Sequence, residues 1–177
     1  MKTYIYLFLI TLSFNSCVTL PSKKMLDNLE MNDDEGIVVG SISMDKRTYS
    51  HGVHLYYSKI DEIGKIKTYS IKIIPPQLVH LHYKPDFFDG FKAVHFFKIK
   101  KPKGKFVFYA KMIEHHKVNQ YGYASERINF PFEIEKGKIK YIGELNFKED
   151  ESFEANNESE RDLIKLKEMF PSLVIEK

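Results

Sequence analysis

Hydrophobic and polar residues alternate along much of the chain with the period of two that is typical of β-strands. The runs are short, rich in β-branched and aromatic residues, and bounded by turn residues. We expect strands at 36–44, 52–60, 67–74, 78–83, 91–100, 105–112, 127–134 and 138–147. No helical pattern separates them, so the sequence predicts a mainly β fold: a single antiparallel β-sandwich of seven to nine strands over residues 36–148.

Two of these strands carry further information. Pro131 cannot donate a hydrogen bond to a neighbouring strand, which favours an edge position or a bulge for 127–134. The strand at 138–147 has the clearest alternation, because four apolar side chains alternate with four polar ones. The apolar set is Ile139, Tyr141, Leu145 and Phe147, and the polar set is Lys138, Lys140, Glu144 and Asn146. A shift of one residue would turn the lysines inward, so we expect this strand to fix its own register.

The C-terminal residues 149–177 change from a polar linker to a helical period. Apolar positions recur at i, i+3 and i+7: Leu163, Leu166 and Phe170. Asn157 can cap such a helix, Glu160 completes a capping box, and Pro171 prevents its continuation. A helix this short is not stable alone in water, so we expect one amphipathic helix that docks on the sandwich.

Residues 1–16 have the pattern of a signal peptide. Lys2 supplies the charged start, residues 4–12 form an apolar run, and a small residue ends the segment. The run is about half of the roughly 20 apolar residues that a membrane-spanning helix needs. We therefore expect cleavage before Cys17, followed by a flexible tether over 17–35.

Cys17, the single cysteine, follows the apolar run directly and has Ser16 before it. This arrangement resembles the lipobox of bacterial lipoproteins, in which the cysteine receives diacylglycerol and fatty acids such as palmitate. Phe14 replaces the usual leucine, a looseness that lipoboxes of spirochaetes and of the Bacteroidetes group tolerate. The resemblance implies that Cys17 is lipidated and anchors the chain to a membrane of the cell envelope, the outer membrane being the expected one. Plain secretion and an uncleaved anchor are the alternatives.

The composition of the chain excludes several kinds of site and one class of partner. A single cysteine at the lipidation site leaves the mature domain without disulfides, cysteine catalysis or cysteine-ligated zinc. The formal charge is +3, and cleavage removes Lys2, the one charged residue in 1–16, to leave 3 − 1 = +2. That charge is too small for the concentrated basic surface that nucleic acid requires, so no nucleic-acid partner is expected.

Two segments, 93–112 and 128–147, share a pattern with a known group of proteins. The first is a strand that ends in a Pro-x-Gly turn and is followed by an aromatic-rich strand. The second carries a motif formed by Phe132, Ile134, Gly137, Lys138, Tyr141, Ile142, Gly143 and Glu144. Together they resemble small β-sandwich lipoproteins of unknown function from bacterial envelopes, whose domains are similar to transthyretin-like and carboxypeptidase-regulatory modules. The resemblance implies a non-catalytic β-sandwich in the envelope.

Histidines are the most abundant reactive groups. His80 and His82 occupy positions i and i+2 of a predicted strand and therefore share one face, where they could bind one zinc or copper ion. A third ligand would come from His54, His95 or a carboxylate on a neighbouring strand. The alternative is a half-exposed strand whose polar face carries histidines. No other element of a metal signature is present, so we expect no cofactor and keep His80 and His82 as candidates.

Catalytic motifs give no positive signal. The chain has no G-x-S-x-G elbow, and its glycines fall singly rather than in a phosphate-binding loop. We expect a non-enzymatic module that binds or scaffolds an envelope or host protein. A metal-binding envelope protein is the alternative, and a hydrolase with scattered site residues is the third hypothesis.

One of Phe87 and Phe88 should be exposed in a loop, where an aromatic cluster would mark a partner surface, unless both pack in the core.

Overall fold

The computed structural model describes residues 22, 25, 27–45, 52–63, 67–73, 85–117 and 120–176. It confirms a mainly β fold with nine strands in two sheets and one C-terminal helix. The elements in chain order are β1 (Glu35–Asp45), β2 (Gly52–Lys59), the 3₁₀-helix η2 (Ile60–Glu62), β3 (Tyr69–Ile73), β4 (Phe87–Asp89), β5 (Lys92–Pro102), β6 (Gly104–Lys117), β7 (Gln120–Ile134), β8 (Ile139–Phe147), β9 (Phe153–Asn156) and α2 (Ser159–Met169). The strand expected at 78–83 lies outside the described residues.

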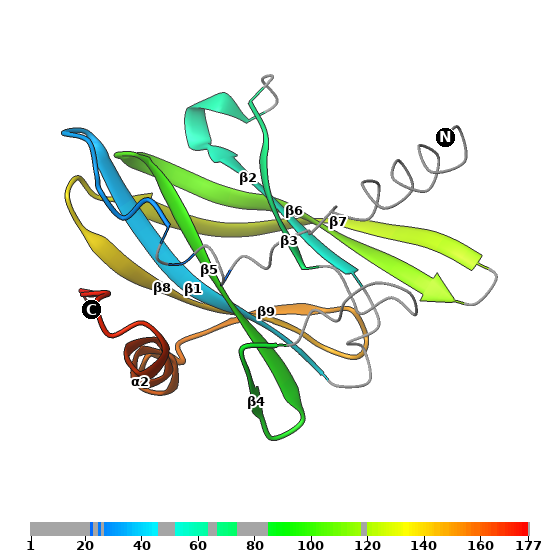
Figure 1. The fold of residues 1–177 in the computed structure, drawn as a ribbon. Helices are drawn as coiled ribbons and strands as arrows, with labels where there is room; N and C mark the ends of the chain where they lie inside the picture. Colours follow the sequence, from blue (N-terminus) through cyan, green and yellow to red (C-terminus); the bar gives the residue numbers. More distant parts are fainter. Residues whose placement is uncertain are drawn as a thin grey trace, which may run out of the picture.

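Two sheets stack to form the sandwich (Figure 1). Sheet A has the order β4-β5-β1-β8-β9, and sheet B has the order β3-β2-β6-β7. The edge position that Pro131 predicts is confirmed, because β7 forms the edge of sheet B. The pairing is not antiparallel throughout, since β1 and β8 run parallel. A parallel pair needs a long connection, and here the chain passes through sheet B between the two strands.

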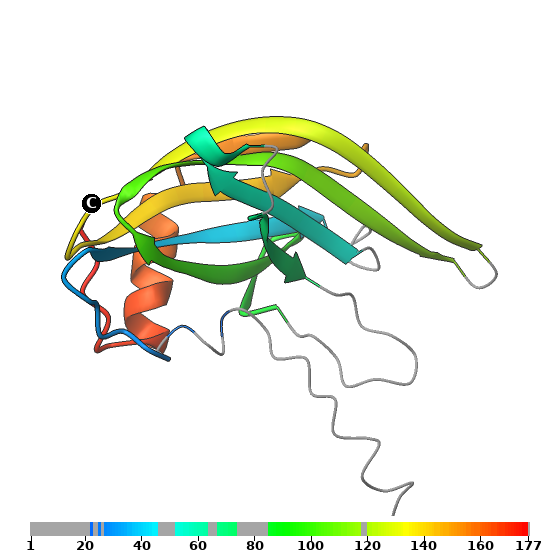
Figure 2. The ribbon, with the colours of Figure 1, turned by 90° about the horizontal axis from the view of Figure 1, so that it is seen from above.

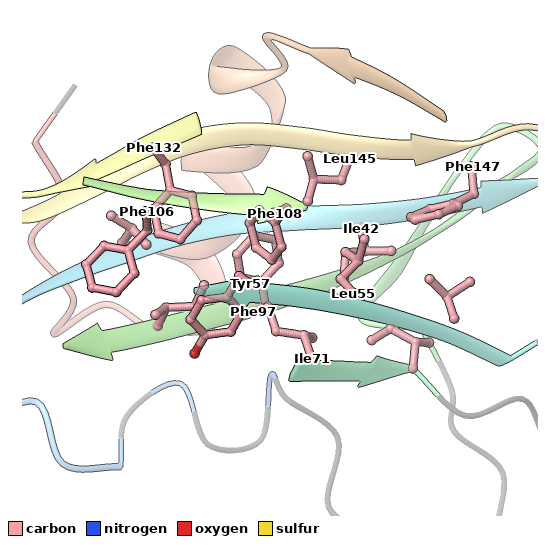
Figure 3. Close-up of a cluster of buried hydrophobic side chains, with 14 of the residues drawn as sticks. Ile42, Leu55, Tyr57, Ile71, Phe97, Phe106, Phe108, Phe132, Leu145 and Phe147 are labelled. Atoms are coloured by element: carbon pink, nitrogen blue, oxygen red, sulfur yellow. The ribbon is translucent and has the colours of Figure 1, made fainter. Parts of the chain in front are cut away.

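Aromatic side chains dominate the core between the two sheets. Phe108 lies at its centre, with its ring centroid 5.1 Å from that of Phe132, 5.4 Å from that of Tyr57 and 6.1 Å from that of Phe97 (Figure 3). All four side chains are at least nine-tenths buried. Because each side chain comes from the inward face of its strand, the core follows directly from the period-two pattern.

A second apolar cluster covers the outer face of sheet A. Its buried members are Met25, Ile37, Val39, Phe96, Leu166 and Leu173. Helix α2 supplies Leu166 and projects from one side of the sheet (Figure 2). Sheet A is therefore covered on both faces, which explains why β1 carries consecutive buried apolar residues instead of strict alternation.

Strand β8 changes face partway along its length. Ile139 and Tyr141 pack on the cluster beneath α2. Leu145 and Phe147, by contrast, belong to the core between the sheets. The change occurs at Gly143, which has φ = +113° and lies where the pairing of β8 with β1 shifts by one residue. The expectation of one continuous alternation was wrong, because this β-bulge inserts an extra residue and reverses every side chain beyond it.

The C-terminal segment contains the expected helix and one unexpected strand. The N-cap of α2 is Glu158, which makes no side-chain capping bond, so the predicted cap at Asn157 was wrong. The side chain of Asn157 accepts a hydrogen bond from the backbone nitrogen of Ser159 at 3.3 Å, in a turn just before the helix. Leu163, Leu166 and Phe170 all pack on the cluster above sheet A. Strand β9 lies within the segment expected to be a polar linker and pairs with β8.

Candidate functional site

The structure leaves most of the predicted site residues untested. Cys17, His80 and His82 lie outside the described residues. His54 and His95 are both buried, but His54 lies on the outward face of sheet B, whereas His95 points into the sandwich from sheet A. No group of three or more His, Cys, Asp or Glu that could hold a metal ion occurs within the described part of the chain. Metal binding by His80 and His82 stays a prediction.

His54 has a carboxylate partner on the next strand. Its Nε2 lies 2.7 Å from Oε1 of Glu114. Burial lowers the pKa of His54, Glu114 opposes that effect, and the charge of Lys72 adds to it, with a net lowering of the pKa. Two protein ligands are too few for a structural zinc site, so we interpret the contact as a buried pair that ties β2 to β6.

His95 makes the stability of the domain dependent on pH. Burial lowers its pKa to about 4, against about 6.5 in an unfolded chain. Between these two values the unfolded chain takes up a proton that the folded domain does not, so acidification favours unfolding. We expect this single group to lower the free energy of unfolding by roughly 3 kcal/mol as the pH falls from 7 to 4. An NMR titration of the folded domain checks this expectation, and a His95 pKa near 6.5 would contradict it.

A network of buried charges lies between α2 and sheet A. Glu144 of β8 and Asp162 of α2 are both fully buried. Arg161 bridges them: its Nη2 lies 2.8 Å from Oε1 of Glu144 and 2.7 Å from Oδ1 of Asp162. Its Nη1 also lies 2.7 Å from Oδ2 of Asp89, at the tip of β4. One guanidinium therefore joins α2 to two strands of the sheet.

The protonation states follow from this geometry. Burial acts to raise the pKa of Glu144, but Arg161, together with Ser43 and Lys92, outweighs it, so the pKa is lowered overall. Asp162 accepts hydrogen bonds from Ser41 Oγ at 2.5 Å and from the hydroxyl of Tyr141 at 2.6 Å. Burial, together with Asp162, raises the pKa of Tyr141, so its hydroxyl keeps the proton. The hydroxyl of Ser41 is bonded to a carboxylate instead of a histidine base, and we therefore assign this network to helix docking.

One sequence signal could have revealed the network. Asp162, Leu166 and Phe170 are spaced at i, i+4 and i+8, so a carboxylate lies on the apolar face of the predicted helix. A charged group in that position is buried when the helix docks, and it then needs a partner. Arg161 is that partner, and it is shared with Glu144. The sequence does not show this sharing, because Glu144 reaches this face only through the bulge in β8.

An open groove lies on sheet B, between η2 and the edge strand β7. Its cavity volume is about 730 Å³, and its apolar walls include Ile60 and Ile63, which are 45% and 50% exposed. Thr68 and the hydroxyl of Tyr109 form a hydrogen-bonded pair of 3.0 Å within it. Among the lining residues that the structure describes, Arg127 is the charged one. This lining suits an extended apolar ligand with an acidic group that can pair with Arg127.

The N-terminal segment joins the domain on the α2 side. Lys98 Nζ donates to the carbonyl oxygen of Asp27, and Lys100 Nζ lies 3.1 Å from Oε2 of Glu35. Met25 is fully buried in the cluster beneath α2. The segment expected to be a flexible tether therefore contacts the domain before Gly36. No helix in the described parts of the chain is both long and apolar enough to cross a membrane.

Comparison with known proteins gives little guidance. No protein-family model matches the chain, and no curated protein matches it. Among solved structures, the chain is similar to a leucine-rich repeat protein from Bacteroides thetaiotaomicron VPI-5482, with 12% sequence identity and a TM-score of 0.35. The similarity covers 79% of this chain but 16% of that protein. A likeness of this size assigns the chain to no family.

Proposed function

We propose that this protein is a lipoprotein of the bacterial cell envelope, anchored by acyl chains on Cys17, whose sandwich domain binds another envelope or host component without catalysing a reaction. The N-terminal sequence carries the proposal. It has a charged start, an apolar run too short to span a bilayer, and a small residue directly before the single cysteine. The resemblance of 93–112 and 128–147 to envelope lipoproteins adds to it.

The point at which the chain meets the domain agrees with such an anchor. Ser22 and Met25 are both buried against the domain. Four residues separate Cys17 from Ser22, and the five extended Cα-to-Cα steps between the two span at most about 17 Å. An acylated Cys17 would therefore hold the domain close to the bilayer.

The groove on sheet B supports the binding part of the proposal. Figure 1 shows η2, which forms one wall of the groove, on the opposite side of the molecule from α2 and the β4–β5 hairpin. The anchored segment joins the domain on the α2 side. A domain held in this way would present the groove away from the membrane, where a partner segment with apolar residues and one acidic group could reach it.

The anchor is tested by replacing Cys17 with alanine. We expect the wild-type protein to incorporate an alkyne analogue of palmitate and the Cys17→Ala protein to incorporate none, because the thiol is the acceptor. Intact mass should show that the variant keeps residues 1–16. Stable anchoring requires more than one acyl chain, so the mature wild type should carry at least two.

Ser13→Ala is the matched control, because it changes a nearby small polar residue and leaves both the apolar run and Ser16 intact. This variant should be labelled and processed like the wild type. Globomycin, which blocks the lipoprotein signal peptidase, should cause the unprocessed form of the wild type to accumulate. An unlabelled wild type, or a label that persists on Cys17→Ala, would rule out lipidation at this residue.

A further inference from the structure

Exposed apolar side chains concentrate on a few elements of the domain. Five of the seven large apolar side chains that are exposed in the described parts of the chain belong to the β4–β5 hairpin, to α2 and to the segment after it: Phe88, Phe91, Ile164, Met169 and Val174. The other two are Ile60 and Ile63, which line the groove on sheet B. Phe91 at 79% and Phe88 at 53% are the aromatic members, and both lie at the hairpin tip.

The hairpin is built to present these rings. Asp89 pairs with Lys92 across a two-residue turn, in which Gly90 has φ = +55°, a conformation that glycine adopts without strain. Arg161 of α2 forms an ion pair with Asp89 at 2.7 Å, and this contact connects the hairpin tip to the helix. Phe87 packs on Phe96 with ring centroids 5.6 Å apart, and by alternation Phe88 points the other way.

The expected anchor joins the chain at the base of this hairpin. Burial raises the pKa of Asp86, the residue directly before β4, and the side chain of the buried Ser22 acts to lower it, so the two residues lie close together. Asp86 Oδ2 in turn accepts a hydrogen bond from the backbone nitrogen of Phe96 at 2.7 Å, which fixes the carboxylate to β5. Cys17 lies five residues before Ser22, so a lipid on Cys17 stays within about 17 Å of the hairpin base.

We propose that the tip of the β4–β5 hairpin, with Phe88 and Phe91, inserts into the interfacial region of the lipid bilayer that carries the anchor. The proposal rests on lipidation of Cys17. Aromatic side chains are favourable at the boundary between headgroups and acyl chains, where apolar surface leaves water. A lipid on a short chain fixes only one point of the domain, whereas a second contact at the hairpin tip fixes its orientation. The groove on sheet B then faces away from the bilayer.

The chain contains no tryptophan, so one substitution creates a single fluorescent reporter. Phe91→Trp places it at the hairpin tip, and Ile63→Trp is the matched control on sheet B, where the native side chain is 50% exposed. The lipidated proteins, purified from membranes, are reconstituted into vesicles of phosphatidylethanolamine and phosphatidylglycerol with acyl-chain-brominated lipid. We expect emission from position 91 to shift to shorter wavelength and to be quenched at least about twofold more than emission from position 63.

Equal quenching at the two positions, or emission from position 91 that vesicles do not change, would overturn the proposal. Phe88→Trp repeats the measurement if Phe91→Trp does not fold. Mass spectrometry of the same samples reports separately whether Cys17 is acylated. If it is not, a maleimide lipid in the vesicles couples to Cys17, the single thiol, and supplies the same attachment point. The fluorescence then tests the orientation even though the natural anchor has failed.

Discussion

Replacing Arg161 with alanine is expected to lower the free energy of unfolding by about 3–5 kcal/mol. The substitution removes the cation that lies between Glu144 and Asp162, and both of these carboxylates are fully buried. Both carboxylates keep the cost of leaving water and lose the attraction of the guanidinium, although Glu144 retains Lys92 at 3.5 Å. Urea denaturation at pH 7 measures the change, and limited proteolysis after Lys165 and Lys167 of α2 should show that the helix detaches first.

Lys165→Ala is the matched control in the same helix. Lys165 forms an ion pair with Glu168 at 2.8 Å, but both side chains are about half exposed. Exposed pairs of this kind contribute less than about 1 kcal/mol. If Arg161→Ala costs no more than Lys165→Ala, the buried network does not hold the helix on the sheet.

Replacing Phe108 with alanine is expected to cost about 3–5 kcal/mol, the usual range for a fully buried phenylalanine. Its ring lies among the rings of Tyr57, Phe97, Phe130 and Phe132, with centroids 5.1–6.2 Å away. These neighbours come from both sheets, so the space left by the ring cannot close without moving one sheet relative to the other. Denaturant unfolding should show a lower midpoint with an unchanged slope.

Phe88→Ala provides the comparison for this effect, because it removes the same side chain from a site that is 53% exposed. Surface substitutions away from special features usually change stability by less than about 0.5 kcal/mol. A Phe88→Ala protein as destabilised as the Phe108→Ala protein would show that the packing between the sheets is not the main source of stability.

Alternation along the chain was enough to predict the sandwich, because each long strand buries one face in the core. Exposure of one member of the Phe87–Phe88 pair was predicted for a related reason, since adjacent aromatic residues in a strand cannot both point inward. The exposed member is Phe88, and it lies in strand β4 instead of the expected loop. Strands β4 and β9 were missed. They are three and four residues long, and pairing with longer neighbours, more than their own composition, defines them as strands.

The buried network could be predicted only in part. Asp162 on an apolar helix face was a readable signal. The other members of the network come from β1, β4 and β8. These strands are far apart along the chain, and only the folded sheet brings them together. The groove was not predicted, because it depends on how η2 lies against β6 and β7 and not on any local motif.

The extra residue at Gly143 has a consequence for the search for relatives. Before it, the apolar side chains of β8 pack beneath α2, and after it those of the same strand pack against the opposite sheet. A homologue without the extra residue would keep the period of two both before and after this point of β8. An alignment without a gap there would pair the residues after Gly143 with the wrong residues of the homologue, one position away. Distant relatives are therefore best matched as two separate half-strands, each scored against its own packing partner.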